Sequence, residues 1–134
     1  MLSLYESLVH SKGSLQEKED CLEITFVGFP EKATVEGLLK AFEAQVHAGK
    51  PKQWWVFDFS GLSLLDWASF ELLGKTLNSL ASAKPPVNGM VFIVPENPFV
   101  RVWLEEELKE IEDIVLTAYF DSCKEARLFM NQVL

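Results

Sequence analysis

Apolar side chains gather in short segments along the chain, in patterns that are typical of strands. Residues 21–29 alternate apolar and polar side chains, which predicts a strand with one buried face. Residues 53–59 and 89–95 are apolar on both faces, as in central strands that helices cover on each side. A fourth strand is predicted at residues 113–120. Residues 1–20 are harder to interpret, and we expect a first strand there, followed by a polar turn or hairpin.

Between these segments, apolar residues recur at helical spacing. One predicted helix has Thr34 as its N-cap, and a second has Asp66. A third begins at Asn97, whose following proline suits a first helical turn. A last helix follows the fourth strand, with Asp121 or Ser122 as its cap. Strands that alternate with helices predict an α/β layered domain in which at least part of the sheet is parallel.

Length and composition favour a single globular domain over residues 1–134. Apolar residues make up 49% of the chain and include ten Phe and four Trp, so we expect a substantial core. The formal net charge of −8 disfavours nucleic acids and anionic membranes as partners. The sequence shows neither an apolar run of the roughly 18–20 residues that span a membrane nor a signal-peptide pattern. We therefore expect a cytoplasmic protein without membrane insertion.

The sequence offers no catalytic motif. It contains no glycine-rich phosphate loop, no nucleophile elbow and no metal-binding spacing among its two cysteines and two histidines. Cys21 and Cys123 are expected to be buried, reduced thiols. Asp58 and Asp66 could form a carboxylate pair, but no partner base is evident. We expect Asp58 to hydrogen-bond the turn after its strand and Asp66 to cap a helix. The sequence thus predicts no catalytic residue, metal or cofactor.

One motif carries a resemblance to a known family. A strand ends in Asp-Phe-Ser-Gly at residues 58–61, and Asp66 opens a helix after a short apolar turn. Three segments share this likeness, at residues 56–73, 90–107 and 114–130. The pattern resembles the STAS domain, which sulfate transporters and anti-sigma-factor antagonists share. The resemblance covers about residues 21–134. It implies about four to five strands in a mixed, largely parallel sheet, with about four helices.

The chain departs from the family where the family carries its switch. In the antagonist branch, a partner kinase phosphorylates the serine that directly follows the helix-opening aspartate. The matching residue here is Trp67, whose indole cannot accept phosphate. Ser63 and Ser69 are nearby hydroxyls, but a phosphate on Ser69 would lie near the carboxylate of Asp66. We therefore expect neither serine to be a tuned switch.

Several aromatic and acidic residues leave alternatives open. Trp67 fits either a partner interface or the core. Trp54 and Trp55 are expected to point into the core on opposite faces of a strand, although Trp54 could reach a surface rim. The stretch 105–113 holds six acids against Lys109. It fits a solvated helix end or a docking patch for a basic partner.

The resemblance implies a non-enzymatic protein–protein interaction module in bacterial regulation. Its partner would be an anti-sigma-type kinase, a transporter component or a second copy of the chain. The expected contact surface centres on the loop 60–65 and the start of the next helix. Its candidate residues are Ser63, Asp66, Trp67, Ser69 and Phe70. The alternatives are a STAS-like subunit of a transporter and a binder of a small apolar ligand or lipid.

Overall fold

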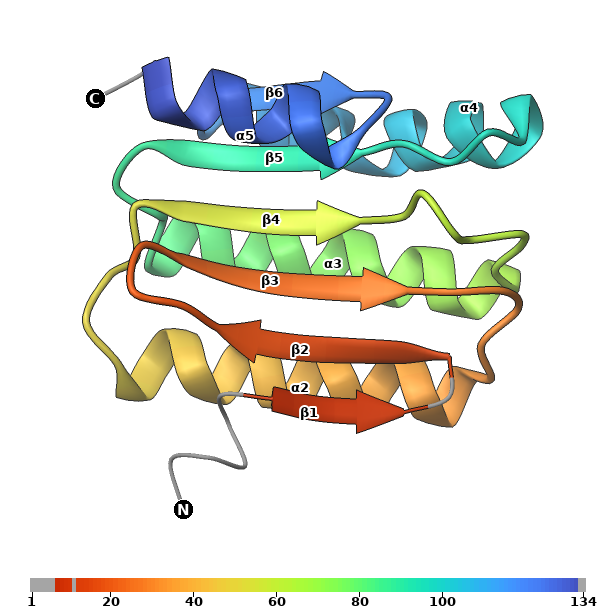
Figure 1. The fold of residues 1–134 in the computed structure, drawn as a ribbon. Coiled ribbons are helices and arrows are strands. Elements are labelled where there is room, and N and C mark those ends of the chain that lie inside the picture. Colours follow the sequence, from red (N-terminus) through yellow and green to blue (C-terminus); the bar gives the residue numbers. More distant parts are fainter. Residues whose placement is uncertain (1–6, 11, 133–134) are drawn as a thin grey trace.

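A single sheet runs through the protein, and helices pack on both of its faces (Figure 1). The structure is a computed structural model that describes residues 7–10 and 12–132. The strands are β1 (Ser7–His10), β2 (Gly13–Glu17), β3 (Cys21–Phe26), β4 (Trp54–Asp58), β5 (Gly89–Ile93) and β6 (Thr117–Phe120). They lie side by side in chain order. The pairs from β3 to β6 are parallel and the first two pairs are antiparallel, which confirms the mixed, largely parallel sheet.

The N-terminal hairpin adds one strand to the four to five that were expected. β1 pairs with β2, and β2 pairs with β3 with Leu15 opposite Ile24. Gly13 sits where the hairpin meets a helix, since a Cβ there would lie 2.6 Å from the side chain of Leu38. Residues 1–6 of the segment predicted as a first strand lie outside the described residues.

The helices form two unequal layers. They are α2 (Lys32–Ala48), α3 (Trp67–Ala83), α4 (Pro98–Leu108), the 3-10 helix η1 (Lys109–Asp113) and α5 (Cys123–Gln132). Figure 1 shows α2, α3 and α4 behind the sheet and α5 alone in front of β5 and β6. The four α-helices within residues 12–132 match the expected number.

Two elements start at clearly different residues from the sequence prediction, whereas strands β3, β4 and β5 are only somewhat shorter than predicted. Glu31, not Thr34, is the N-cap of α2, because the Thr34 amide already donates to the Glu31 carbonyl oxygen at 3.0 Å. The last strand begins at Thr117 instead of residue 113, because residues 109–113 form η1 and bury Ile111 against the core. Both differences arise at segment ends, where local pattern is weakest.

Trp54 and Trp55 anchor the two sides of the sheet. Trp55 is 2% exposed and meets Phe42 of α2 edge to face, with ring centroids 5.2 Å apart. Trp54 is 1% exposed and meets Phe129 of α5 at 5.6 Å. The prediction that these neighbours point into the core on opposite faces is confirmed, and Trp54 does not reach a surface rim.

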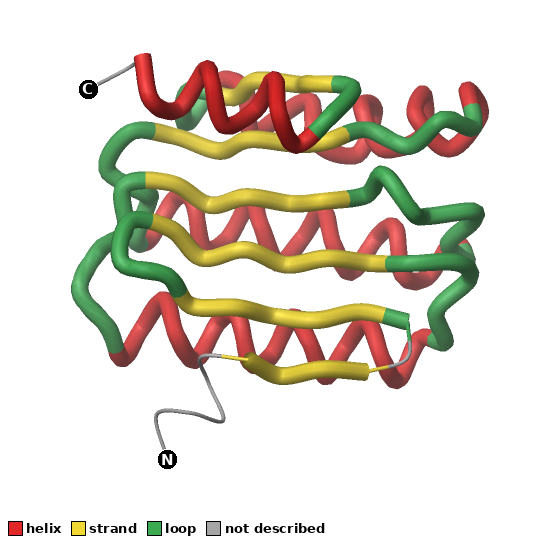
Figure 2. The backbone as a smooth tube through the Cα atoms, in the orientation of Figure 1, coloured by secondary structure: helices red, strands yellow, loops and turns green. Residues whose placement is uncertain are grey.

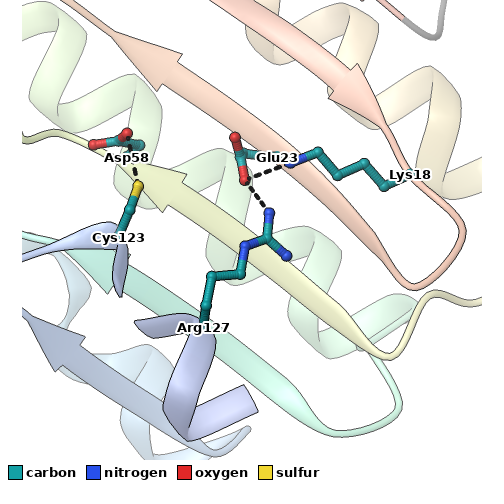
Figure 3. A network of polar contacts seen from close by, with 5 residues as sticks. All are labelled: Lys18, Glu23, Asp58, Cys123 and Arg127. Atoms are coloured by element: carbon teal, nitrogen blue, oxygen red, sulfur yellow. Dashed lines mark hydrogen bonds and ion pairs between the residues drawn. The ribbon is translucent and has the colours of Figure 1, made fainter. Parts of the chain in front are cut away.

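A polar cluster fastens α5 to the less covered face of the sheet (Figure 3). An oxygen of Glu23 on β3 accepts from Lys18 Nζ at 3.3 Å and from Arg127 Nη2 of α5 at 3.0 Å. Glu23 is half-buried, so this charge-assisted pairing replaces part of its lost hydration.

No helix in the described part of the chain is long and apolar enough to cross a membrane.

Candidate interaction site

The loops that follow β3, β4 and β5 meet at one edge of the sheet, because these strands are parallel (Figure 2). Backbone hydrogen bonds join the first two of these loops. The Gly28 amide donates to the Gly61 carbonyl oxygen at 2.8 Å, and the Ser63 amide donates to the Gly28 carbonyl oxygen at 2.8 Å. Gly28 has a φ of +66°, a conformation that favours glycine. The loop 60–65 is therefore held in a defined position.

Asp58 organises the turn at the end of β4, as expected. Its Oδ1 atom accepts from the Ser60 amide at 2.9 Å and from Ser60 Oγ at 2.6 Å. Its Oδ2 atom accepts from the thiol of Cys123 at 3.6 Å (Figure 3). Both oxygens of this carboxylate are engaged in holding the turn and the start of α5.

The prediction of two buried thiols is right for Cys21 and wrong for Cys123. Cys123 is the first residue of α5, and its side chain is exposed at the helix end. Partial burial and the neighbouring carboxylate of Asp58 raise the pKa of the Cys123 thiol. The thiolate is the nucleophilic form of cysteine, so this environment disfavours nucleophilic chemistry.

Asp66 caps α3, as the sequence predicts. Its Oδ1 atom accepts from the Ser69 amide at 2.7 Å. The cap makes Trp67 the first helical residue, and 61% of the Trp67 side chain is exposed. The structure therefore excludes the core alternative for Trp67, and a partner interface at this side chain stays a prediction.

Two of the expected contact residues are not on the surface. Ser69 and Phe70 are both 0% exposed, since the first turn of α3 directs these positions toward the sheet. The prediction that Ser69 and Phe70 lie on the contact surface is therefore wrong, because both side chains are buried. Ser69 Oγ has no hydrogen-bond partner within the described residues, and a kinase could not reach it in this conformation. Ser63 is exposed and Asp66 is half-buried, so both remain accessible.

Trp67 belongs to a wider apolar surface that the sequence interpretation missed. We call it the aromatic surface and define it by four exposed side chains: Phe29, Trp67, Phe99 and Trp103. Buried Phe70 lies beneath two of them, with ring centroids 6.4 Å from Trp67 and 5.9 Å from Trp103. Phe29 lines a hollow together with Asp66, next to Trp67 in the chain.

The spacing of apolar residues in α4 already indicated that Phe99 and Trp103 lie outside its buried face. Its buried stripe is Val100, Leu104 and Leu108, each four residues apart. Phe99 and Trp103 repeat the same spacing one position earlier, so they lie beside the stripe instead of within it. Phe29 carried no comparable signal, because it follows the end of β3 in an irregular turn.

Comparison with solved structures places this geometry among known folds. A crystal structure of an anti-sigma factor antagonist from Mycobacterium paratuberculosis matches with a TM-score of 0.57 and 15% identity, over 89% of this chain and 90% of that one. The anti-sigma factor antagonist SpoIIAA in its unphosphorylated form matches with a TM-score of 0.61 and 12% identity, over 90% of this chain and 97% of that one. The fold is that of a STAS domain. No family model and no curated protein matches the sequence.

The STAS-like domain holds no evident centre for metal chemistry in the part of the chain that the structure describes. No group of three or more His, Cys, Asp or Glu side chains within residues 12–132 could hold a metal ion. A hollow at this end of the strands is lined by residues 60–63 with Glu96 and Asn97. This edge of the domain presents the aromatic surface and the loop 60–65 to solvent.

Proposed function

We propose that this chain is a STAS-like protein–protein interaction module in bacterial cytoplasmic regulation. Its contact surface comprises the loop 60–65, with Ser63, and the start of α3, with Asp66 and Trp67. The observation that carries the proposal is the 61% exposure of Trp67 on a capped helix end. A large aromatic side chain with few rotatable bonds is a favourable anchor, since burying it costs little conformational entropy.

We also propose that no phosphorylation at position 67 controls this binding. The residue that follows the helix-opening aspartate is Trp67, and the nearest helical hydroxyl, that of Ser69, is buried. Binding is therefore constitutive or is controlled elsewhere, for example by the amount of the partner. The family resemblance and the fold favour a partner of the anti-sigma-kinase type.

A binding role also fits the chemistry of the polar residues at this edge better than catalysis does. Asp58 is occupied by Ser60 and Cys123, and Asp66 is occupied by the amide of Ser69. The raised pKa of Cys123 keeps the thiol protonated at neutral pH. These groups are used to shape the surface, which supports a non-enzymatic module.

The test is partner capture with matched variants. Partners are purified from the native cell with three proteins: the unchanged chain, Trp67→Ala and Val87→Ala. The affinity of a captured partner for each protein is then measured by titration. Val87 is a suitable control because it is 67% exposed and precedes β5, at the opposite edge of the sheet. We expect Trp67→Ala to weaken binding at least about tenfold and Val87→Ala to leave it unchanged. Equal affinity for all three proteins would remove this surface from the proposal.

A further inference from the structure

The aromatic surface continues into a groove between α3 and α4. Phe70 of α3 packs against Trp103 of α4, and one turn further along Gly74 packs against Glu107. A Cβ on Gly74 would lie 2.7 Å from the Glu107 carboxylate and 3.3 Å from its carbonyl oxygen. The missing side chain at Gly74 thus allows the two helices to approach closely.

The far half of this groove is acidic. A hollow there is lined by Gly74, Lys75, Asn78, Glu106, Glu107 and Glu110. Three carboxylates therefore face one ammonium group. Within residues 12–132, none of these three glutamates takes part in an ion pair. Arg101, the basic residue of α4, is already paired with Asp121 at 2.7 Å and so does not neutralise them.

The aromatic surface and the acidic hollow together extend along α3 over the length of a short helix. Trp67 and Asn78 mark its two ends on α3, and at 1.5 Å per residue they are about 16 Å apart along the helix axis. A segment of about three helical turns would cover this length. Its first part would meet indole rings, and its second part would meet carboxylates.

We propose that this groove receives a basic amphipathic segment of a partner protein. Apolar side chains of the segment cover Trp67 and Trp103, and its Lys or Arg side chains lie along Glu106 and Glu110. The inference rests on the proposed function and names the class of partner for the same surface. Charge complementarity supports it, because desolvating carboxylates beside an apolar contact requires cations opposite them. Arginine side chains can also stack on the exposed indole rings.

Two other occupants fit less well. A symmetric pair of copies would bring the same patch of each chain together, so the unpaired glutamates would face a chain that also carries a net charge of −8. An anionic membrane would meet the same repulsion. A basic segment is the occupant that satisfies both halves of the groove.

The test uses the full chain and two synthetic helical peptides. Both carry the same leucine face; one carries lysine and arginine at the charged positions, and the other carries glutamate there. Each peptide is titrated into three proteins, and changes in the amide NMR shifts show where it binds. The proteins are the wild type, the groove variant Glu106→Gln/Glu110→Gln and the control variant Glu19→Gln/Glu43→Gln, which removes the same number of charges. The control residues are exposed on other elements, at the β2–β3 turn and on α2.

We expect the basic peptide alone to shift the amides around Trp67, Trp103 and Glu110. Its affinity should fall with salt, and the groove variant should weaken it about threefold to tenfold while the control changes little. No binding, equal binding of both peptides, or equal loss in both double variants would overturn the inference. A dimer lost in Trp103→Ala, or binding of the wild type to anionic vesicles through this face, would also overturn it.

These outcomes are separable from failure of the proposed function. A partner whose binding depends on Trp67 but not on Glu106 and Glu110 would refute the basic segment and keep the interaction module. A captured partner that is indifferent to Trp67 would refute the module itself, whatever the peptides do.

Discussion

Two pairs of tryptophans in this protein have opposite surroundings. Trp54 and Trp55 are neighbours on β4 and are 1% and 2% exposed, since a helix packs over each of them. Trp67 and Trp103 lie on α3 and α4 and are 61% and 40% exposed. The first pair joins the layers of the fold. The rings of the second pair both lie near the buried ring of Phe70, and both are partly exposed to solvent.

The difference teaches what each pair contributes. The apolar area of the β4 pair is already removed from water, so its free energy is part of the stability of the fold. The area of the helical pair is still hydrated, so the corresponding free energy becomes available only when a partner covers it. Mutations should therefore separate the two pairs, with large effects on unfolding in one and on binding in the other.

The largest expected effect is on the β4 pair. Trp55→Ala should lower the free energy of unfolding by about 3–5 kcal/mol, because it opens a cavity against Phe42. The matched change Trp67→Ala should lower it by no more than about 1 kcal/mol, because most of that side chain is already in water. Urea unfolding followed by circular dichroism measures both. Comparable losses of unfolding free energy in the two variants would contradict the view that the β4 pair stabilises the fold and the helical pair does not.

The next largest effect is expected from a charge placed in the buried part of the first turn of α3. Ser69→Glu should lower the free energy of unfolding by at least about 2 kcal/mol, because it puts a carboxylate at a position that is 0% exposed. Ser69→Ala is the control, and it should be neutral or stabilising because Ser69 Oγ has no partner among the described residues. Thermal and urea unfolding measure both variants. A stable Ser69→Glu protein would mean that the first turn of α3 opens readily, and phosphorylation there would again be feasible.

Tyr119 lies between the two extremes, since it is half-buried on β6 and stacks on Phe92 at 5.4 Å. Burial, with Glu112 and Glu105 adding to it, raises the pKa of Tyr119 to about 12. In the unfolded chain the tyrosine side chain has a pKa near 10. The folded state is therefore fully stable with respect to this group below about pH 10, and it loses free energy of unfolding as the pH rises from about 10 through about 12. We expect a loss of about 1–2 kcal/mol, reduced by partial exposure.

The measurement is the free energy of unfolding in urea between neutral and strongly alkaline pH. Tyr119→Phe is the control, because it keeps the ring and removes the titrating hydroxyl. Its stability should depend less on pH in the alkaline range. An identical pH dependence in both proteins would show that Tyr119 is solvated like an exposed residue. Its ring would then pack less closely against Phe92 than in the structure.

The smallest effect concerns the cap that positions Trp67. Asp66→Ala should lower the free energy of unfolding by about 1 kcal/mol, because the Ser69 amide loses its acceptor at 2.7 Å. Asp66→Asn should restore most of this stability, since asparagine caps helices about as well. Partner affinity should follow the same order if the cap fixes the orientation of Trp67. Unchanged stability in Asp66→Ala would show that the helix start is held by the loop 60–65 alone.

Much of the scaffold of the site could be predicted from local sequence. Asp66 and Asn97 act as caps because a short acceptor side chain before an apolar helical stripe has few other conformations to favour. Asp58 holds its turn for a similar local reason. Trp54 and Trp55 were predictable because alternation along a strand covered on both sides leaves each of them only a core to enter.

Exposure at the helix starts was decided by the tertiary structure. The pattern of α3 was compatible with Trp67 in either the core or the surface. Packing of Phe70 against Trp103, which lies 33 residues further along the chain, determines that Phe70 enters the core and Trp67 does not. Likewise, Cys123 is exposed because it is the first residue of α5 and lies beside Asp58, at the carboxyl end of β4 (Figure 3).

The sequence by itself determined the alternation of strands and helices from residue 21 onward and the caps Asp66 and Asn97, because these follow from spacings within about twenty residues. The resemblance of the residues around Asp58 and Asp66 to a known family implied the STAS-like architecture. Only the tertiary structure decided which aromatic side chains gather at the surface. Phe29, Trp67, Phe99 and Trp103 come from three separate parts of the chain, after β3, on α3 and on α4. Parallel strands bring those parts to one edge of the sheet, and long-range packing then determines which rings remain in contact with water.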